Sequence, residues 1–209
     1  AEYNSENMSL FPALVNTIVM TLVSLLIAVP LGVFSAVYLT EYAKRGNKLV
    51  TIVGITTETL SGIPSIVYGL FGYLLFVTKL KWSYSMLAGA LTLAIMILPL
   101  IMRTTEEALR SVPDSYREGS FGLGAGKLRT VFTVVLPSAV PGILAGVILA
   151  IGRIAGETAA LIFTAGTVAQ IPKNLMGSGR TLAVHLYALW NEGLAAEQSY
   201  ATAVVLLII

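Results

Sequence analysis

The feature that most restricts the fold of this chain is the stretch at residues 12–39, which is apolar and carries no charged side chain. A helix needs about 20 mostly apolar residues to cross the hydrocarbon core of a bilayer. Within lipid, a helix satisfies its own backbone hydrogen bonds, whereas an open strand leaves them unpaired. Residues 12–39 are therefore predicted to cross a membrane as an α-helix.

Similar apolar segments recur along the chain, at about residues 50–77, 84–102, 134–163 and 200–209. Only 11% of the residues are charged, against roughly a quarter in soluble domains. The last segment is still apolar at Ile209, where about ten residues are too few to span as a helix. We expect an all-α integral membrane protein with about five spans, the fifth clipped at its end.

The remaining composition excludes several classes of function. The chain has no cysteine, one histidine and a net charge of +2. It therefore offers no disulfide framework, no thiolate or multi-histidine metal site, and no basic surface for nucleic acid. Its acids inside apolar segments are Glu58 and Glu157, which do not supply the nucleophile, base and oxyanion donors of an enzyme site. We expect neither an enzyme nor a metal protein.

The positions of lysine and arginine predict the orientation, because cytoplasmic loops of membrane proteins are enriched in both. Eight of these residues fall at 40–49 and 103–133, against four on the other side: Lys79, Lys81, Lys173 and Arg180. The loops 40–49 and 103–133 are therefore predicted to be cytoplasmic. The polar segment at residues 1–9 is then external, and we expect a further helix before it.

Residues 118–127 read EGSFGLGAGK and look at first like a phosphate-binding loop. A P-loop has the pattern G-x-x-x-x-G-K-[ST], but Phe121 stands in place of its first glycine and Leu128 in place of its hydroxyl. The dinucleotide pattern G-x-G-x-x-G fails as well, because Lys127 replaces its last glycine. We therefore expect no nucleotide site and no cofactor bound by this chain.

The loop at 103–133 contains two capping-box patterns, which mark helix starts. Thr104 with Glu107 starts a helix or simply extends the third span, and Ser115 with Glu118 starts another helix after a proline. The glycines that follow predict a tight turn. The loop is thus expected to form a helix–turn–helix, which either docks against a partner or serves as an ordinary solvated connector.

Charged residues inside apolar segments are costly and usually face a cavity or a partner. Arg153 and Glu157 are spaced i, i+4, so on a helix they share one face and can pair. One interpretation is a mutually neutralised pair near the outer interface. The other is that Arg153 contacts an anion on a translocation path, since its planar fork suits phosphate, while Glu157 weakens its grip and allows release.

The second apolar segment contains Glu58 and Ser61 among several threonines, just before Gly62 and Pro64. A proline frees a backbone carbonyl that hydroxyls or water can satisfy, so Gly62 and Pro64 predict a kink or hinge. Glu58 and Ser61 either line a path or are bonded inside the helix bundle. Both interpretations stay open at this point.

Two glycine pairs, Gly142/Gly146 and Gly152/Gly156, form stripes of small residues that are typical of close helix packing. We interpret them as structural. The single histidine, His185, has apolar neighbours and is expected on a short amphipathic helix at the outer surface.

The loop resembles the EAA-x3-G-x9-I-x-L-P signature of ABC importer permeases, with small departures at its alanines and its isoleucine. The matching residues are Glu118, Gly119, Ser120, Gly124, Val134, Leu136 and Pro137. In that family the loop forms coupling helices, which sit in a cleft of a cytoplasmic ATPase and follow its opening and closing. The resemblance therefore implies that residues 103–133 couple this chain to an ATPase.

A broader resemblance covers nearly the whole chain. The segments at 11–43, 58–72, 98–120 and 136–166 are similar to the phosphate-specific ABC importer, and among its two permease subunits to the A-type. This resemblance implies a type I importer transmembrane domain over residues 10–209. It also implies six spans in the complete subunit, the first before the present start of the chain and the last cut at its end.

The resemblance implies a permease subunit that forms half of a phosphate pathway in a bacterial or archaeal cytoplasmic membrane. A homologous second permease, two copies of a cytoplasmic ATPase and an external phosphate-binding protein would complete the assembly, with ATP and Mg²⁺ acting in the ATPase. The family carries the same Arg-x-x-x-Glu, which puts Arg153 and Glu157 on the pathway, and Glu58 and Ser61 are further candidates. The alternative is a type I permease for another anion or small solute.

Overall fold

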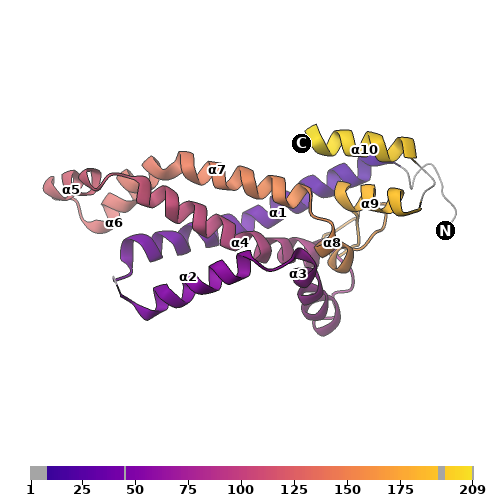
Figure 1. The fold of residues 1–209 in the computed structure, drawn as a ribbon, viewed down its shortest axis with the longest axis horizontal. Helices are drawn as coiled ribbons and strands as arrows, with labels where there is room; N and C mark the ends of the chain where they lie inside the picture. The colour runs from indigo at the N-terminus through magenta and orange to yellow at the C-terminus, as the bar shows by residue number, and fades with distance from the viewer. Residues whose placement is uncertain (1–8, 45, 193–195, 209) are drawn as a thin grey trace. The chain divides into compact units, whose positions relative to one another are not determined.

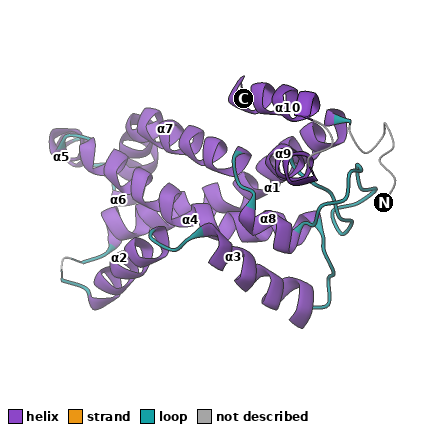
Figure 2. Cartoon of the chain, turned by 45° about the vertical axis from the view of Figure 1, so that its right-hand side comes forward, coloured by secondary structure: helices purple, strands orange, loops and turns teal. Residues whose placement is uncertain are grey.

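The structure is a computed structural model that describes residues 9–44, 46–192 and 196–208. Every regular element in these ranges is helical (Figures 1 and 2), which confirms the all-α prediction. In chain order the elements are α1 (Leu10–Val37), η1 (Tyr38–Tyr42), α2 (Lys48–Ser61), α3 (Ser65–Gly72), η2 (Tyr73–Lys79), α4 (Met86–Ser111), α5 (Asp114–Gly122), α6 (Lys127–Thr130), η3 (Val131–Val135), α7 (Leu136–Ala155), α8 (Ala159–Thr164), α9 (Leu182–Glu192) and α10 (Ala196–Ile208). The three η elements are short π-helical turns.

Three continuous helical stretches are long and apolar enough to cross a membrane: Leu10–Tyr42, Met86–Ser111 and Lys127–Ala155. The helices Val50–Ser61 and Ser65–Lys79 add a fourth span if they are taken as one interrupted span. The fifth predicted segment corresponds to α10, which has 13 residues in the described chain. Multiple membrane spans are therefore supported by helix length as well as by composition.

The second predicted span is interrupted at the site where the sequence predicts a kink. Helix α2 ends at Ser61, and α3 begins at Ser65 after Pro64, whose backbone is extended with φ −59° and ψ 142°. Proline cannot donate a backbone hydrogen bond and disfavours a helical residue before it. Gly62 and Pro64 therefore separate two helices here, which is a larger break than a kink in one helix.

The chain divides into two compact units. The first unit comprises Ala1–Ile27, Ile63–Met96 and Ile151–Ile209, and the second comprises Ala28–Gly62 and Ile97–Ala150. Helices α1, α4 and α7 each contribute residues to both units.

The first unit is held together by close helix packing and by hydrogen bonds between loops. Gly69 of α3 lies against α8, and a Cβ atom on Gly69 would be 2.8 Å from the Cα of Ala160. The absence of a side chain at Gly69 therefore permits this close approach. The backbone N–H of Ser85 donates to the carbonyl of Thr164 at 3.0 Å, which joins the loop before α4 to the end of α8.

The second unit has an apolar core where the end of α1 meets the end of α4 and the start of α7. The buried members of this core are Ala36, Val37, Ala108, Leu109, Val112, Val131, Val135, Ala139 and Ile143.

Loops predicted on the same side of the membrane lie together in each unit. In the second unit, the Lys127 ammonium lies 5.2 Å from the centroid of the Tyr42 ring, which brings the loop after α1 to the loop at 103–133. In the first unit, the backbone N–H of Met86 donates to the carbonyl of Gly177 at 2.9 Å, between the two loops predicted to be external. Both contacts agree with the predicted same-side pairs, and the cytoplasmic side remains a prediction from the charges.

The two glycine stripes of α7 differ in their surroundings. A Cβ atom on Gly142 would lie 2.7 Å from the Cβ of Ala108, and one on Gly146 would lie 2.7 Å from the Cβ of Thr104. Close packing of α7 on α4 is therefore confirmed at this stripe. A Cβ atom on Gly152 would have no neighbour within 4 Å in the described chain, so the second stripe is not packed in the same way.

We expect Gly146→Ala to lower the stability of the folded chain by about 1–3 kcal/mol, because the added methyl group overpacks the contact with Thr104. Gly152→Ala is the matched control on the same helix, and it should be neutral or stabilising by about 0.5–1 kcal/mol. Thermal unfolding of the purified protein in detergent measures both. Equal melting temperatures for the two variants would contradict the packing assignment.

Candidate functional site

The loop at 103–133 forms the helix–turn–helix that its sequence predicts, with α5 and α6 on the two sides of the turn. The hydroxyl groups of Ser120 and Thr130 lie 2.8 Å apart and join these two helices. Contiguous exposed apolar surface is typical of a contact surface. The large exposed apolar side chains of the loop are Tyr116, Phe121, Leu123, Leu128 and Phe132.

The two capping-box predictions have different outcomes. Helix α4 continues to Ser111, so Thr104 and Glu107 extend the third span, which is one of the two alternatives. The second box is wrong: α5 begins at Asp114, Ser115 lies inside its first turn, and no side chain caps its start. The N-cap residue is Pro113, which has an extended backbone and a fixed φ angle, and the helix begins at the next residue.

The tight turn between α5 and α6 requires glycine at one position. Gly124 has φ +83°, in the left-handed region that residues with a Cβ atom rarely adopt. Its N–H donates to the carbonyl of Phe121 at 2.9 Å, and the N–H of Ala125 donates to the carbonyl of Ser120 at 3.1 Å. These two bonds close the turn, so the shape of the loop depends on the backbone of Gly124.

The residues of the EAA-like signature divide between the surface and the core of the second unit. Glu118, Gly119 and Gly124 are exposed on the helix–turn–helix, and Pro137 is exposed at the start of α7. The other three are partly buried, and Leu136 packs against the apolar core. Part of the motif therefore lies on the surface of the loop, and the other part attaches the loop to α7. The three partly buried residues are Ser120, Val134 and Leu136.

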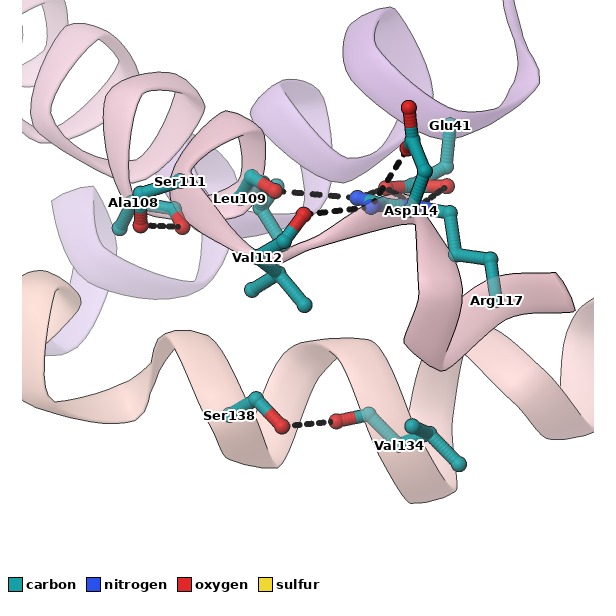
Figure 3. Close-up of polar contacts among 9 residues, drawn as sticks. All are labelled: Glu41, Ala108, Leu109, Ser111, Val112, Asp114, Arg117, Val134 and Ser138. Carbon is teal, nitrogen blue, oxygen red and sulfur yellow. Dashed lines mark hydrogen bonds and ion pairs between the residues drawn. The ribbon is translucent and has the colours of Figure 1, made fainter. Parts of the chain in front are cut away.

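The structure reveals a polar cluster at the base of α5 that the sequence did not predict (Figure 3). The Arg117 guanidinium donates to the Glu41 carboxylate, with Nη2–Oε1 at 2.6 Å and Nε–Oε1 at 3.2 Å. It also donates to the backbone carbonyls of Val112 at 2.8 Å and Leu109 at 3.0 Å, and to the Asp114 carboxylate at 3.2 Å. Arg117 thus connects α5 to the last turn of α4 and to η1.

The ion pair between Arg117 and Glu41 is largely shielded from solvent. The side chains are 16% and 8% exposed, respectively, whereas Asp114 is 87% exposed. The hydrogen bond with Glu41 raises the pKa of the Arg117 guanidinium, although burial acts in the opposite direction. A guanidinium is charged at neutral pH, so removing the Glu41 carboxylate would leave this charge unpaired in a poorly solvated place.

Arg153 and Glu157 do not form the predicted i, i+4 pair. Helix α7 ends at Ala155, so the two side chains do not share a helical face. Glu157 is buried, and its Oε1 accepts a hydrogen bond from the backbone N–H of Ala160 at 3.0 Å. In the described chain, no ion pair joins Arg153 to Glu157. The mutually neutralised pair is therefore wrong, because the break after α7 turns Glu157 towards the start of α8.

Arg153 lies in the last turn of α7 and is partly exposed. The partial negative charge at a helix C-terminus favours a cation at this position. In the first unit, the guanidinium of Arg153 thus lies at the end of α7 and forms no ion pair with Glu157.

Glu58 and Ser61 belong to the second unit, whereas Arg153 and Glu157 belong to the first. Glu58 is exposed on α2 and lines a cavity of about 270 Å³. The Ser61 hydroxyl donates to the carbonyl of Thr57 at 2.8 Å, within its own helix. The facing wall of the cavity consists of four charged residues of α4, Arg103, Glu106, Glu107 and Arg110.

His185 lies on a short helix, α9, as its sequence predicts, but it is buried and not at the surface. Its exposed fraction is 0%, and neither ring nitrogen has a hydrogen-bond partner among the described residues. Burial, with a smaller contribution from the charge of Arg180, lowers the pKa of His185 to about 4. The imidazole is therefore neutral at neutral pH.

A family model described as the binding-protein-dependent transport system inner membrane component matches residues 28–209. The chain belongs to this family. It is 41% identical over 197 residues to the probable ABC transporter permease protein YqgI of Bacillus subtilis (strain 168), which covers 88% of this chain and 67% of the relative.

Two relatives of this transport component carry a substrate in their names. The chain is 37% identical over 210 residues to the phosphate transport system permease protein PstA of Pasteurella multocida (strain Pm70), covering 97% of this chain and 74% of the relative. It is 41% identical over 156 residues to PstA 1 of Mycobacterium tuberculosis (strain CDC 1551 / Oshkosh), covering 75% and 51%. The chain thus spans between about half and three quarters of the length of these relatives.

Solved transporters show the fold of this family member. A chain of the MetNI methionine ABC transporter in an inward-facing conformation matches with a TM-score of 0.71 at 23% identity, over 95% of this chain and 86% of that one. A chain of an amino acid ABC transporter solved with histidines gives 0.68 at 17% identity over the same shares. The type I ABC importer transmembrane fold is thereby confirmed.

The buried imidazole predicts that this transport component loses stability in acid. Between pH 6.5 and 4 the unfolded chain binds a proton at His185 while the folded chain does not, so stability falls as the pH falls through this window. The loss attributable to His185 is on the order of 1–3 kcal/mol.

Thermal unfolding in detergent at pH 7 and pH 4 measures this effect against His185→Gln, which does not titrate. Carboxylates titrate in both proteins, so their contributions cancel in the difference. The melting temperature of the wild type should fall further than that of the variant, and parallel pH curves would overturn the assignment to His185.

Proposed function

We propose that the chain is the permease subunit of an ATP-driven phosphate importer in a bacterial cytoplasmic membrane. The observation that carries this proposal is its similarity to the PstA proteins, which reaches 37% identity over 97% of the chain for the Pasteurella multocida relative. The type I fold supports a transport role, and the failed nucleotide patterns support a subunit without its own ATP site. Residues 10–209 would form the transmembrane domain.

Arg153 is the proposed phosphate contact of this subunit. A guanidinium presents its donors in a planar fork that matches phosphate oxygens, and Arg153 is partly exposed with no ion pair to Glu157. Glu157 would act indirectly, since its bond to the start of α8 holds that helix in place. Glu58 and Ser61 would contribute a separate polar stretch of the pathway in the second unit.

The proposed assembly contains a homologous second permease, two copies of a cytoplasmic ATPase and an external phosphate-binding protein. ATP and Mg²⁺ would act in the ATPase. The helix–turn–helix at 103–133 would dock in that ATPase, because it presents Glu118 and apolar side chains such as Leu123 on an exposed surface. The loops at 40–49 and 103–133 would lie in the cytoplasm, as their basic residues predict.

The second candidate is a type I permease for another anion or small solute. The Bacillus subtilis relative is named for permease activity with no substrate, and the same fold occurs in a methionine transporter. Uptake of radiolabelled phosphate by the reconstituted complex, with sulfate or methionine in excess, separates the two. Phosphate uptake that resists both competitors supports the first proposal.

Arg153→Gln should reduce phosphate uptake by the reconstituted complex at least tenfold, because the amide keeps hydrogen-bonding capacity but loses the charge that attracts the anion. The complex should still assemble, which co-purification of the ATPase measures. Lys173→Gln is the control, since Lys173 is an exposed cation of the same unit. Wild-type uptake by Arg153→Gln would exclude Arg153 from the pathway.

Gly124→Val should weaken docking of the ATPase, since valine strains the left-handed backbone at φ +83° and changes the turn. Glu118→Lys should weaken the same contact by reversing an exposed charge. The fraction of ATPase that co-purifies with the permease measures both effects. Gly122→Ala is the control, because Gly122 is also exposed but has no positive φ. Unchanged association of the ATPase with both Gly124→Val and Glu118→Lys would contradict the docking role.

A further inference from the structure

We infer that the ion pair between Arg117 and Glu41 is the positioning element that ties the coupling helix α5 to the end of α1. This inference rests on the proposed coupling of α5 to an ATPase, and it adds the route by which α5 would move a membrane span. Arg117 and Glu41 are not part of the EAA-like motif, and neither side chain is exposed.

Besides the contacts of Arg117, helix α5 lies against the neighbouring α6 and η3. None of its residues is buried, so it lacks the apolar contact face that normally fixes a helix on a protein. Apart from Arg117, its described side-chain hydrogen bonds to other elements come from Ser120, which contacts Thr130 of the neighbouring α6. Arg117 therefore makes the side-chain hydrogen bonds that attach α5 to η1 and to the end of α4.

Arg117 is suited to this task by its number of bonds. Its guanidinium donates hydrogen bonds to the Glu41 carboxylate, to the carbonyls of Leu109 and Val112, and to the Asp114 carboxylate. Leu109 lies in the last turn of α4, and Val112 directly follows the last residue of this helix. Backbone carbonyls at such a helix end need hydrogen-bond donors from outside the helix. Lysine would keep the charge but not the planar fork that reaches all of these acceptors.

Glu41 provides the connection to α1. It lies in η1, the π-helical turn that continues α1, and its side chain is 8% exposed. Directly before η1, Ala36 and Val37 are buried in the same apolar core as Leu109 and Val112. A displacement of α5 would thus be passed through Arg117 to Glu41 and from there to a span packed in this core.

The test uses a double-mutant cycle in the complete reconstituted complex. Arg117→Gln and Glu41→Gln should each reduce the phosphate moved per ATP hydrolysed at least fivefold. The double variant should be no worse than the more severe single variant, because both changes remove the same contact. Asp114→Asn is the matched control and should stay within twofold of wild type, since its contact with Arg117 is exposed.

Arg117→Lys keeps the proposal testable if the glutamine variants fail to assemble. It keeps a cation opposite Glu41, so the complex should form, but the loss of the fork should still lower the phosphate moved per ATP at least twofold. Wild-type coupling in Arg117→Lys or Arg117→Gln, or effects of the two single changes that multiply in the double variant, would overturn the proposal.

A distance measurement separates this inference from the proposed function. The chain has no cysteine, so spin labels can be placed on cysteines at Leu31 of α1 and Ser115 of α5, both exposed and in the same unit. Arg117→Gln should broaden the distance distribution relative to wild type and to Asp114→Asn. An unchanged distance distribution would overturn the positioning role of the ion pair between Arg117 and Glu41, even if phosphate transport is confirmed. A broadened distribution without phosphate transport would contradict only the proposed function.

Discussion

Backbone hydrogen bonding in lipid is the constraint on which the rest of this structure depends. A membrane-spanning segment satisfies its N–H and C=O groups by being helical, so each interruption needs other partners. After the first interruption, the carbonyl of Pro64 accepts from Val67 at 3.0 Å. After the second, the Glu157 carboxylate accepts from Ala160 at 3.0 Å. Polar residues at such breaks therefore have a structural task even where they also suit a pathway.

Close helix packing follows from the same environment, because apolar side chains gain little by leaving lipid for a helix interface. Small residues let backbones approach, and this happens where Gly69 meets Ala160 and where Gly146 meets Thr104. Near the loop at 103–133 the situation differs, since α5 buries no residue and Arg117 bonds it to η1 and to the end of α4. The second unit thus combines an apolar core with a polar attachment at its solvated end.

Local features of the fold could be predicted from the sequence, whereas features that depend on distant pairs could not. Long apolar runs predict helices, and the Gly62–Pro64 pair predicts an interruption, because both act within a few residues. The contact of Arg117 with Glu41 joins residues 76 positions apart, and no spacing rule connects them. The expected pair of Arg153 with Glu157 is wrong for a related reason. The spacing argument requires a helix that continues to Glu157, whereas α7 ends at Ala155.

The end of α7 also changes how the charge of Arg153 is balanced. A carboxylate beside it would cancel a full charge, but Glu157 is bonded to the start of α8. Arg153 lies in the last turn of α7, whose C-terminus carries roughly half a negative charge spread over its last carbonyls. Partial compensation would leave the proposed site attractive to an anion while weakening its binding relative to a bare cation. Passage of an ion requires such a balance, because a site that binds too tightly cannot release.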